Sequence, residues 1–229
     1  MPSEKLHLAI IPDGNRRWAK AKGLLPWSGH TQAVENFRSL TEWCRNAPRI
    51  GVLTVWCFST ENWKRDQKEI AMLMNLLEDY LRKERTGFLR EKTRFVHSGR
   101  RDRIPASLAK LIGEVEEETK EQTEFILHLA VDYGGKDDIL RAMQKLQLSQ
   151  SGATEMSEEH LRTCLDHPEL PDIDLILRTS GEERTSNFFL WQSTYSEWIF
   201  TEKFFPDITT KDLEAAVEEF DRRKRRFGR

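Results

Sequence analysis

The sequence predicts an α/β fold: a mostly parallel central sheet flanked by helices on both faces. Two observations support this prediction. Short apolar runs alternate along the chain with segments whose apolar residues recur at helical spacing. The apolar runs are also continuous, as expected for strands that are buried on both faces. No Pro/Gly/Ser-rich linker divides the 229 residues, so we expect a single domain spanning residues 1–229.

The first half of the chain contains two clear strands and two amphipathic helices. The first strand is expected at residues 8–11, where the turn-forming residues 12–15 end an apolar run. A helix with one buried face is expected over residues 31–47. Residues 51–58 are β-branched and aromatic, which favours a second strand. The longest helix is expected from residue 67 to about residue 85 because one face of that segment is apolar.

The second half repeats this order of strand followed by helix, which argues for parallel strand pairing. Polar residues follow several of the apolar runs, so those strands are expected to end in polar loops. The expected elements are a strand at 93–96, a helix beginning at Pro105, a strand at 125–131, helices at 137–146 and 158–165, strands at 173–177 and 197–200, and a helix at 211–223.

Composition excludes several classes of function. The 36 basic and 38 acidic residues are interspersed, which does not support a general affinity for nucleic acid. No apolar run is long enough to span a bilayer and no secretory h-region precedes the first strand, so we expect a cytoplasmic protein. Cys44, Cys57 and Cys164 are odd in number and widely spaced, which favours reduced, buried thiols over disulfides or a zinc site.

The carboxyl ends of parallel strands lie along one edge of a sheet, so the segments after residues 11, 58, 131 and 177 should meet there. A carboxylate among arginines and hydroxyls suits a phosphate ester and a divalent metal. No Ser-His-Asp spacing, Cys-His cluster, Walker loop or GxGxxG motif is present. The converging side chains are Asp13, Asn15, Arg17, Trp18, Ser59, Glu61, Asn62, Trp63, Arg65, Asp132, Arg178, Thr179, Ser180, Arg184 and Ser186.

Several motifs in series resemble those of the cis-prenyltransferases, the undecaprenyl diphosphate synthase family. They are HLAIIPDGNRRWAK, the pair Gly29-His30, FSTENWKR, DYGGKDDI, DLILRTSGEERTSNFFLWQ with YSEWIF, and the terminal RRFG. The match covers nearly the whole chain in the order typical of the family. Each string alone is weak, but together they leave little room for coincidence.

This resemblance implies a prenyltransferase of isoprenoid biosynthesis. The enzyme would condense isopentenyl diphosphate with an allylic diphosphate and form a cis double bond, while Mg²⁺ assists departure of pyrophosphate. The resemblance also implies an apolar tunnel for the product, a homodimer in which residues 226–228 reach toward the partner's site, and peripheral membrane contact for product release. Residues 52–55, 70–81 and 125–129 could line such a tunnel, although core packing explains them as well.

The resemblance also implies roles for individual residues. Asp13 would be the central catalytic and metal-binding group, Asn62 would help to remove the proton, and Glu197 would be a second metal-linked acid. For Trp18 and Trp63 core packing is an alternative to substrate binding, and for His30 the alternative is capping of the following helix. The implied substrate-binding residues are Gly14, Asn15, Arg16, Arg17, Trp18, His30, Ser59, Thr60, Glu61, Trp63, Arg65, Arg178, Arg184, Thr185 and Ser186. The histidines treated as structural are His97, His128, His160 and His167.

Two positions depart from the family pattern. Pro26 stands four residues before His30, where the family usually has an arginine that helps to hold diphosphate, and Glu183 replaces a histidine near the metal. Three interpretations stay open: ordinary chain elongation, irregular or branched condensation of small allylic diphosphates, and a non-catalytic partner subunit. The sequence does not determine the length of the product, although a bulky side chain of Trp56, Met74 or Tyr80 could close the end of a short tunnel.

Overall fold

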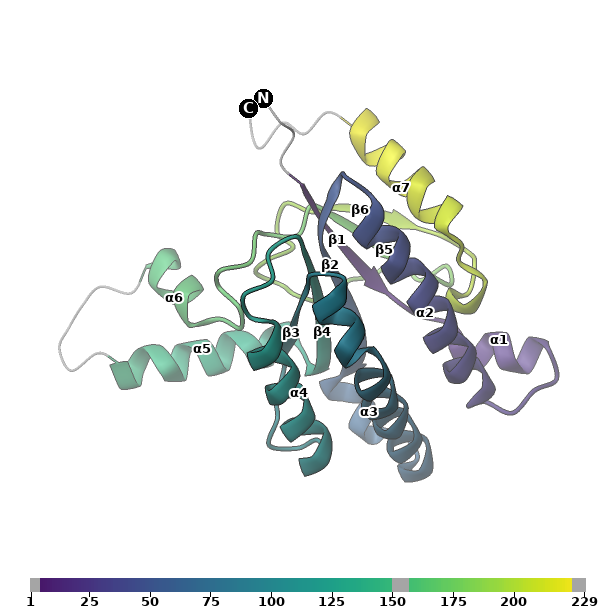
Figure 1. Ribbon diagram of the computed structural model, residues 1–229, viewed down its shortest axis with the longest axis horizontal. Helices are drawn as coiled ribbons and strands as arrows, with labels where there is room; N and C mark the ends of the chain where they lie inside the picture. The colour runs from purple at the N-terminus through teal and green to yellow at the C-terminus, as the bar shows by residue number, and fades with distance from the viewer. Residues whose placement is uncertain (1–4, 150–156, 224–229) are drawn as a thin grey trace.

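The computed structural model describes residues 5–149 and 157–223, which build one six-stranded sheet (Figure 1). The strand order is β3-β4-β2-β1-β5-β6, and every neighbouring pair is parallel. The sheet is thus more regular than the mostly parallel one that the sequence predicts. The strands, in chain order, are β1 (Leu6–Ile11), β2 (Ile50–Ser59), β3 (Thr93–Ser98), β4 (Phe125–Tyr133), β5 (Leu175–Arg178) and β6 (Glu197–Phe200).

Seven α-helices and two short 3₁₀ helices connect these strands within the described residues. The helix predicted over residues 67–85 extends to Arg90, and a short helix follows the first strand directly. The helices are α1 (Asn15–Ala21), α2 (Ser28–Asn46), η1 (Thr60–Lys64), α3 (Gln67–Arg90), α4 (Ala106–Thr119), α5 (Gly135–Ser149), α6 (Glu158–Cys164), η2 (Phe205–Asp207) and α7 (Thr210–Arg222). None of them is long and apolar enough to cross a membrane.

Strand β1 is buried along its whole length, and its side chains belong to two hydrophobic cores, one on each face of the sheet. Leu8 and Ile10 belong to the larger core, which includes residues of α2, α3, α4 and α7. Ala9 and Ile11 belong to a second core with Phe188 and other aromatic residues on the opposite face. Successive side chains of a strand point to opposite faces, which is why a continuous apolar run fits this central position.

A line of buried polar side chains crosses the smaller core from β1 to β3. The backbone oxygen of Pro171 can only accept a hydrogen bond, so His7 Nδ1 donates to it at 2.8 Å and His7 Nε2 accepts from Thr54 Oγ1 at 2.6 Å. Thr54 Oγ1 then accepts from His128 Nδ1 at 2.8 Å, and His128 Nε2 accepts from Ser98 Oγ at 2.7 Å. One carbonyl therefore fixes the tautomers of both histidines across four adjacent strands. This agrees with the structural role expected for His128.

We predict that the protein loses stability as the pH falls from 6.5 toward 4. Burial lowers the pKa of His7 to about 4 and that of His97 to about 3, and it lowers the pKa of His128 as well. The unfolded chain therefore binds more protons than the folded chain in this window, at a cost of about 3 kcal/mol for His7 alone. Burial also lowers the pKa of His167, but the hydrogen bond and charge of Glu169, the hydrogen bond to the His97 backbone and the charge of Glu116 together raise it above its usual value, which offsets part of the effect. Chemical denaturation measured between pH 7 and pH 4 checks the slope, and His7→Asn should flatten it. A stability that is constant across the window would contradict the prediction.

Candidate active site

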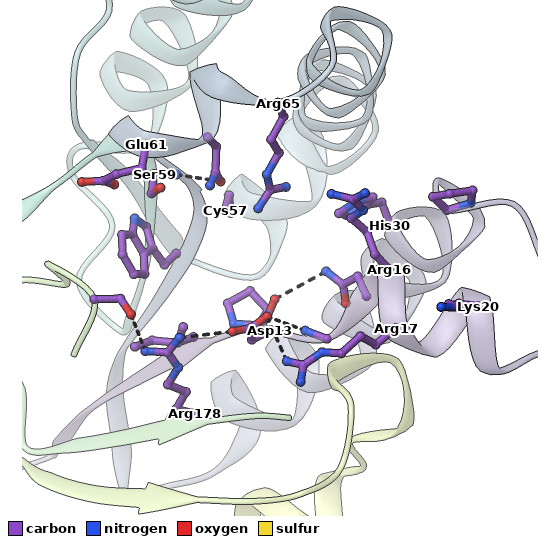
Figure 2. A pocket seen from close by; sticks show the side chains of 18 of the residues that line it. Asp13, Arg16, Arg17, Lys20, His30, Cys57, Ser59, Glu61, Arg65 and Arg178 are labelled. Atoms are coloured by element: carbon purple, nitrogen blue, oxygen red, sulfur yellow. Dashed lines mark hydrogen bonds and ion pairs between the residues drawn. The ribbon is translucent and has the colours of Figure 1, made fainter. Parts of the chain in front are cut away.

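A pocket of about 1090 Å³ opens at the carboxyl edge of the sheet, where β1, β2 and β5 end (Figure 2). It collects residues from the end of β1, helix α1, the loop between α1 and α2, the start of α2, the end of β2 with the segment that follows it, and the end of β5 with the loop after it. The edge predicted from parallel topology is therefore the edge that carries the pocket. The predicted site residues that line it are Asp13, Gly14, Asn15, Arg16, Arg17, His30, Ser59, Glu61, Asn62, Arg65, Arg178 and Ser186.

Asp13 is held in place by its own backbone. Thr179 Oγ1 accepts from the backbone nitrogen of Asp13 at 2.8 Å and donates to the backbone oxygen of Asp13 at 2.8 Å. The backbone nitrogen of Phe205 also donates to that oxygen at 3.1 Å. The carboxylate accepts from the backbone nitrogen of Gly14 at 2.7 Å and is about one-third exposed. It therefore faces the pocket in a fixed direction.

Arg178 is the cation nearest to this carboxylate. Its guanidinium donates to Asp13 Oδ2 at 3.1 Å and to Ser186 Oγ at 2.8 Å, and it also donates to the backbone oxygen of Arg184. Arg178 is only 3% exposed although it lines the pocket. A guanidinium that is buried to this extent requires such partners, so Arg178 is a fixed positive charge at the pocket floor.

Helix α1 supplies a second group of cations. Arg17 donates to Ser180 Oγ at 2.6 Å, lies 3.8 Å from Asp13 Oδ1 and pairs with Glu182 at 3.0 Å. Gly14 starts this turn with φ +93°, and a Cβ there would lie 2.5 Å from the Phe204 ring and 2.8 Å from Ser180 Cβ. The close approach of α1 to the loop after β5 therefore requires glycine at residue 14.

The wall formed by α1, α2 and the β2–α3 connection brings two arginines and a histidine around Glu69. Arg65 lies 3.2 Å from its carboxylate, His30 lies 3.5 Å from it and Arg16 lies 3.7 Å from it. Burial lowers the pKa of His30, and the neighbouring Arg65 and Arg16 lower it further against the opposing effect of Glu69. His30 is therefore neutral near pH 7, and the fixed charge of this wall comes from its arginines.

The segment after β2 has its own hydrogen-bonded cap. The backbone nitrogen of Ser59 donates to Asn62 Oδ1 at 3.2 Å, and the Ser59 side chain accepts from the Asn62 backbone in return. Partial burial raises the pKa of Glu61, but hydrogen bonds from the backbone, Ser59 and Asn187 outweigh this and lower it. Glu61 is thus a carboxylate at neutral pH, and the amide oxygen of Asn62 already accepts a hydrogen bond.

Three buried polar atoms in pocket-lining residues lack a hydrogen-bond partner: Asn15 Oδ1, His30 Nε2 and Arg178 Nε. Buried polar atoms are rarely left unsatisfied in folded proteins, and a cluster of them points to a missing ligand or water. Because two of the three atoms are ring or guanidinium nitrogens beside several arginines, the pocket is suited to an anion.

Asp13 can contribute to a magnesium site but cannot form a complete one. Within residues 5–149 and 157–223, no group of three His, Cys, Asp or Glu side chains could hold a metal ion. Mg²⁺ is commonly bound through one or two carboxylates together with phosphate oxygens and water. A single exposed carboxylate beside an anion pocket fits an ion that is shared with a bound phosphate group.

Several predicted site residues lie outside this pocket. Trp18 donates to Asp207 Oδ1 at 2.8 Å, and Trp63 donates to Asp132 Oδ1 at 2.8 Å while its ring packs on Phe58. For both tryptophans, the packing alternative describes what the structure shows. The other predicted residues that do not line the pocket are Thr60, Asp132, Thr179, Ser180, Arg184, Thr185 and Glu197.

Glu197 is not brought together with Asp13 in this chain. It is the first residue of β6 and pairs in register with Leu175, whereas Arg178 and Phe200 mark the pocket edge three residues further along. The Glu197 carboxylate instead pairs with Arg223 at 2.9 Å. Within one subunit the geometry does not support the pairing of Glu197 with Asp13 as two ligands of one metal ion.

The pocket has an apolar floor made by the end of β2. Trp56 and Cys57 line it, and burial raises the pKa of the Cys57 thiol to about 12, so the thiol is neutral. All three cysteines are free, as predicted. Of the three residues that could close a short tunnel, Met74 and Tyr80 are buried in the main core and do not line the pocket, whereas Trp56 does line it.

Lys20 lines the pocket, in agreement with the positive charge that the basic run after the first strand is expected to bring there. Sequence reasoning assigned no site role to Asn187, which also lines the pocket. Asn187 joins three loops. Its side chain accepts from the backbone nitrogen of Lys136 at 2.8 Å and donates to Glu61 at 3.1 Å. No local pattern reveals this role, since it depends on the meeting of distant segments.

Known proteins resemble this chain over nearly its whole length. A family model for undecaprenyl diphosphate synthase matches residues 11–228. An isoprenyl transferase of Wolinella succinogenes is 42% identical over 226 residues, which are 99% of this chain and 97% of that protein. The crystal structure of lavandulyl diphosphate synthase from Lavandula x intermedia in complex with dimethylallyl diphosphate matches with a TM-score of 0.90 and 32% identity, covering 97% of this chain and 98% of the other. A probable undecaprenyl diphosphate synthase from Campylobacter jejuni matches with a TM-score of 0.83 and 34% identity, covering 99% and 100%.

We predict that Asn187→Ala loosens the segment after β2. The substitution removes the hydrogen bonds to Glu61 and Lys136 while leaving the core intact, so amide hydrogen exchange should rise at residues 59–65 and 134–137. Hydrogen–deuterium exchange with mass spectrometry measures this. Asn36→Ala, which removes one hydrogen bond to the backbone of Phe205, is the matched control and should leave both segments unchanged. Equal exchange in the two variants would contradict the role given to Asn187.

Proposed function

The chain belongs to the undecaprenyl diphosphate synthase family and is an isoprenyl transferase, and from this premise we propose that its pocket condenses isopentenyl diphosphate with an allylic diphosphate. The single observation that carries the assignment of the pocket is the position of Asp13, fixed between Arg178 and Arg17 above an apolar floor. One end of the pocket suits diphosphate and the other suits a hydrocarbon chain.

In the proposed reaction, the allylic carbon–oxygen bond breaks and pyrophosphate leaves. The terminal carbon of isopentenyl diphosphate then forms the new carbon–carbon bond, and loss of a proton gives the cis double bond. Negative charge builds on the departing pyrophosphate. Fixed cationic donors stabilise that charge more in the transition state than in the ground state, and each such donor commonly contributes about 3 kcal/mol.

We assign the two diphosphates to the two walls of the pocket. Arg16, Arg17 and His30 lie on the side of α1 and α2 and would hold the allylic diphosphate beside Asp13. Arg178 and Ser186 lie at the end of β5 and would hold the isopentenyl diphosphate. Support for this division comes from the two groups of cations, which approach Asp13 from opposite sides (Figure 2).

The segment of residues 59–65 would cover the substrates and shield them from water. Its Arg65 faces the pocket beside Glu69, and Asn62 stands at its centre. The amide oxygen of Asn62 accepts from the Ser59 backbone, so its proposed part in proton removal would begin with release of that hydrogen bond. Arg184 and Thr185 are exposed and would have to move inward to contact a diphosphate.

Asp13 is the residue that we propose to hold Mg²⁺ together with diphosphate oxygens. When bound, Mg²⁺ neutralises charge on the departing pyrophosphate. The backbone hydrogen bonds with Thr179 keep the Asp13 carboxylate oriented toward that position. One oxygen of the carboxylate accepts from Gly14 and the other pairs with Arg178, so metal binding would share these oxygens with existing donors.

Irregular condensation of two small allylic diphosphates is a second candidate. The solved structure that matches with a TM-score of 0.90 is a lavandulyl diphosphate synthase bound to dimethylallyl diphosphate. The expected tunnel region is also filled: Tyr80 packs between Phe37, at 5.1 Å between ring centroids, and Phe88, at 6.4 Å. Pro26 contributes no cation to the pocket. These features favour small substrates and leave the choice of second substrate to experiment.

We further propose that residues 1–229 form one domain and that two copies form a homodimer. One sheet contains strands from both halves of the chain, which supports a single domain.

Strand β6 is the edge strand of the sheet and carries the exposed Phe200, and Tyr195 is exposed just before it. This edge is therefore a candidate for contact between two subunits. Residues 226–228, expected to reach the partner's site, lie outside the described residues. Sedimentation velocity that shows only monomers would exclude the dimer.

A product assay tests the proposed function. Purified protein with Mg²⁺ is incubated with dimethylallyl, geranyl or farnesyl diphosphate, with and without isopentenyl diphosphate, and products are identified by mass spectrometry. Polyprenyl products that require isopentenyl diphosphate are the expected outcome. Products formed without it would support irregular condensation instead, and the absence of any product would favour a non-catalytic partner subunit.

Asp13→Ala should reduce turnover in this assay by at least about 100-fold, because it removes the carboxylate that orients the metal and the diphosphates. The far-ultraviolet circular dichroism spectrum should stay native, since Asp13 is partly exposed and its backbone contacts with Thr179 do not need the side chain. Turnover close to that of the unchanged protein would remove Asp13 from the mechanism.

Tyr80→Ala should lengthen the products. We propose that the growing chain extends from Cys57 into the space between α2 and α3, where the buried Tyr80 ring stops it. Removing that ring would open the space to further isoprene units. Leu111→Ala, a core truncation in α4, is the matched control for destabilisation. An unchanged product distribution in Tyr80→Ala would show that another residue sets the length.

A further inference from the structure

Asp132 is a buried carboxylate near the end of β4 that contacts the segment after β2 from outside the pocket. It is fully buried and does not line the pocket, although the sequence places it among the converging polar residues. Its backbone φ is +53°, in the left-handed region that residues other than glycine rarely adopt. The ladder between β2 and β4 skips Asp132, because Val131 and Tyr133 pair with two consecutive residues of β2. This irregularity takes the carboxylate out of the regular alternation of the strand.

Three N–H donors from two other segments satisfy this carboxylate. Trp63 Nε1, in the segment after β2, donates to Asp132 Oδ1 at 2.8 Å. Arg103, in the connection between β3 and α4, donates through Nε to Oδ2 at 2.7 Å and through Nη2 to Oδ1. Such a two-point contact fixes both partners in one geometry, and a buried carboxylate is costly without a partner. Because β4 lies between β2 and β3 (Figure 1), Asp132 ties together the segments that follow its two neighbouring strands.

Trp63 is the residue that connects this carboxylate to the pocket. Its ring packs edge-on against Phe58, with 5.1 Å between the ring centroids, and contacts the main core. The indole is therefore held by its ring and by its N–H at the same time. The residue before it in the chain is Asn62, which lines the pocket.

Two other contacts of residues 59–65 restrain that segment less. The hydrogen bonds between Ser59 and Asn62 lie within the segment, so they shape it without attaching it to the sheet. The hydrogen bond from Asn187 to Glu61 is exposed, so water competes for both groups. The bond from the indole to a buried carboxylate is protected from this competition.

We propose that Asp132, held by Arg103, is a positioning residue: through Trp63 it keeps Asn62 in the place that the reaction requires. Asp132, Arg103 and Trp63 do not line the pocket, so their effect passes through the backbone of the segment rather than through contact with substrate. The part given to Asn62 rests on the proposed function, whereas the anchoring of the segment by Asp132 does not.

This anchor should affect the rate of the reaction more than the binding of substrates. A displacement of about 1 Å at a reacting group can cost about 100-fold in rate. The cations that would hold the diphosphates belong to α1 and β5 and have partners of their own, as Arg17 has in Glu182 and Arg178 has in Ser186. Loss of the anchor therefore leaves those cations in place.

Trp63→Phe tests the anchor in protein without substrate, because it keeps a ring on Phe58 and removes the N–H donor. Amide hydrogen exchange at residues 59–65 should rise, and hydrogen–deuterium exchange with mass spectrometry measures it. Trp18→Phe is the matched control, since it removes an indole N–H that donates to Asp207 at the same distance of 2.8 Å. Equal exchange at residues 59–65 in the two variants would overturn the proposal.

Arg103→Gln tests the consequence for the reaction, with isopentenyl diphosphate and the allylic diphosphate that gives the most product. The kcat should fall about 10- to 100-fold, while the KM for each diphosphate stays close to that of the unchanged protein. Arg103→Lys restores a cation beside Asp132 and should recover part of the lost kcat. Arg101→Gln is the matched control and should keep its kcat, since Arg101 lies in the same connection with its side chain 41% exposed, against 39% for Arg103, and pairs with Glu116 instead.

These measurements separate positioning from a loss of stability and from the proposed function. All assays are run at a temperature where circular dichroism shows every variant to be folded. An unchanged kcat in Arg103→Gln would overturn the proposal, as would a rise in KM alone or an equal fall in kcat in Arg101→Gln. If the unchanged protein forms no product, the proposed function fails, and the exchange comparison still decides whether Asp132 anchors the segment.

Discussion

The ion pair between Asp13 and Arg178 joins the ends of two neighbouring strands, and the geometry of the pocket depends on it. Ile11 of β1 pairs in register with Arg178 of β5, so a shift of one residue would turn Arg178 to the other face. Arg178 is almost fully buried, and its guanidinium divides its hydrogen bonds among Asp13, Ser186 and the backbone oxygen of Arg184. The pair thus fixes sheet register and site charge at the same time.

Much of the site could be predicted because parallel topology alone brings strand ends together. The polar segments after β1, β2 and β5 do line one pocket, as their places in the sequence indicate. The same topology places Glu197 at the opposite edge, because the strand predicted at 197–200 begins with it, and only the family resemblance brought it to the metal site. Trp18 and Trp63 were ambiguous, since only the positions of Asp207 and Asp132 show that both indole N–H groups donate to carboxylates outside the pocket.

The cations of the pocket are compensated by carboxylates from other elements. Glu69 faces Arg16 and Arg65, and Glu182 faces Arg17. These pairs are partly exposed and individually contribute little to stability. These carboxylates do hold the long side chains of α1 and the β2–α3 connection close together. Binding of an anion therefore costs less side-chain conformational entropy. A diphosphate would compete with these carboxylates for cations that are already gathered around it.

Pro26 leaves the loop between α1 and α2 without a charged side chain at the pocket opening. A proline supplies neither charge nor a hydrogen-bond donor, so the loop that contains it presents apolar groups to the pocket opening. Positive charge is concentrated instead on one turn of α1, where Arg16, Arg17 and Lys20 recur at helical spacing. Helix α1 begins immediately after Asp13 and Gly14, so these cations are positioned by the same turn that positions the central carboxylate. The charged wall is therefore attached to the turn whose backbone is held by Thr179 and Phe205, while the loop with Pro26 carries no charge at the pocket opening.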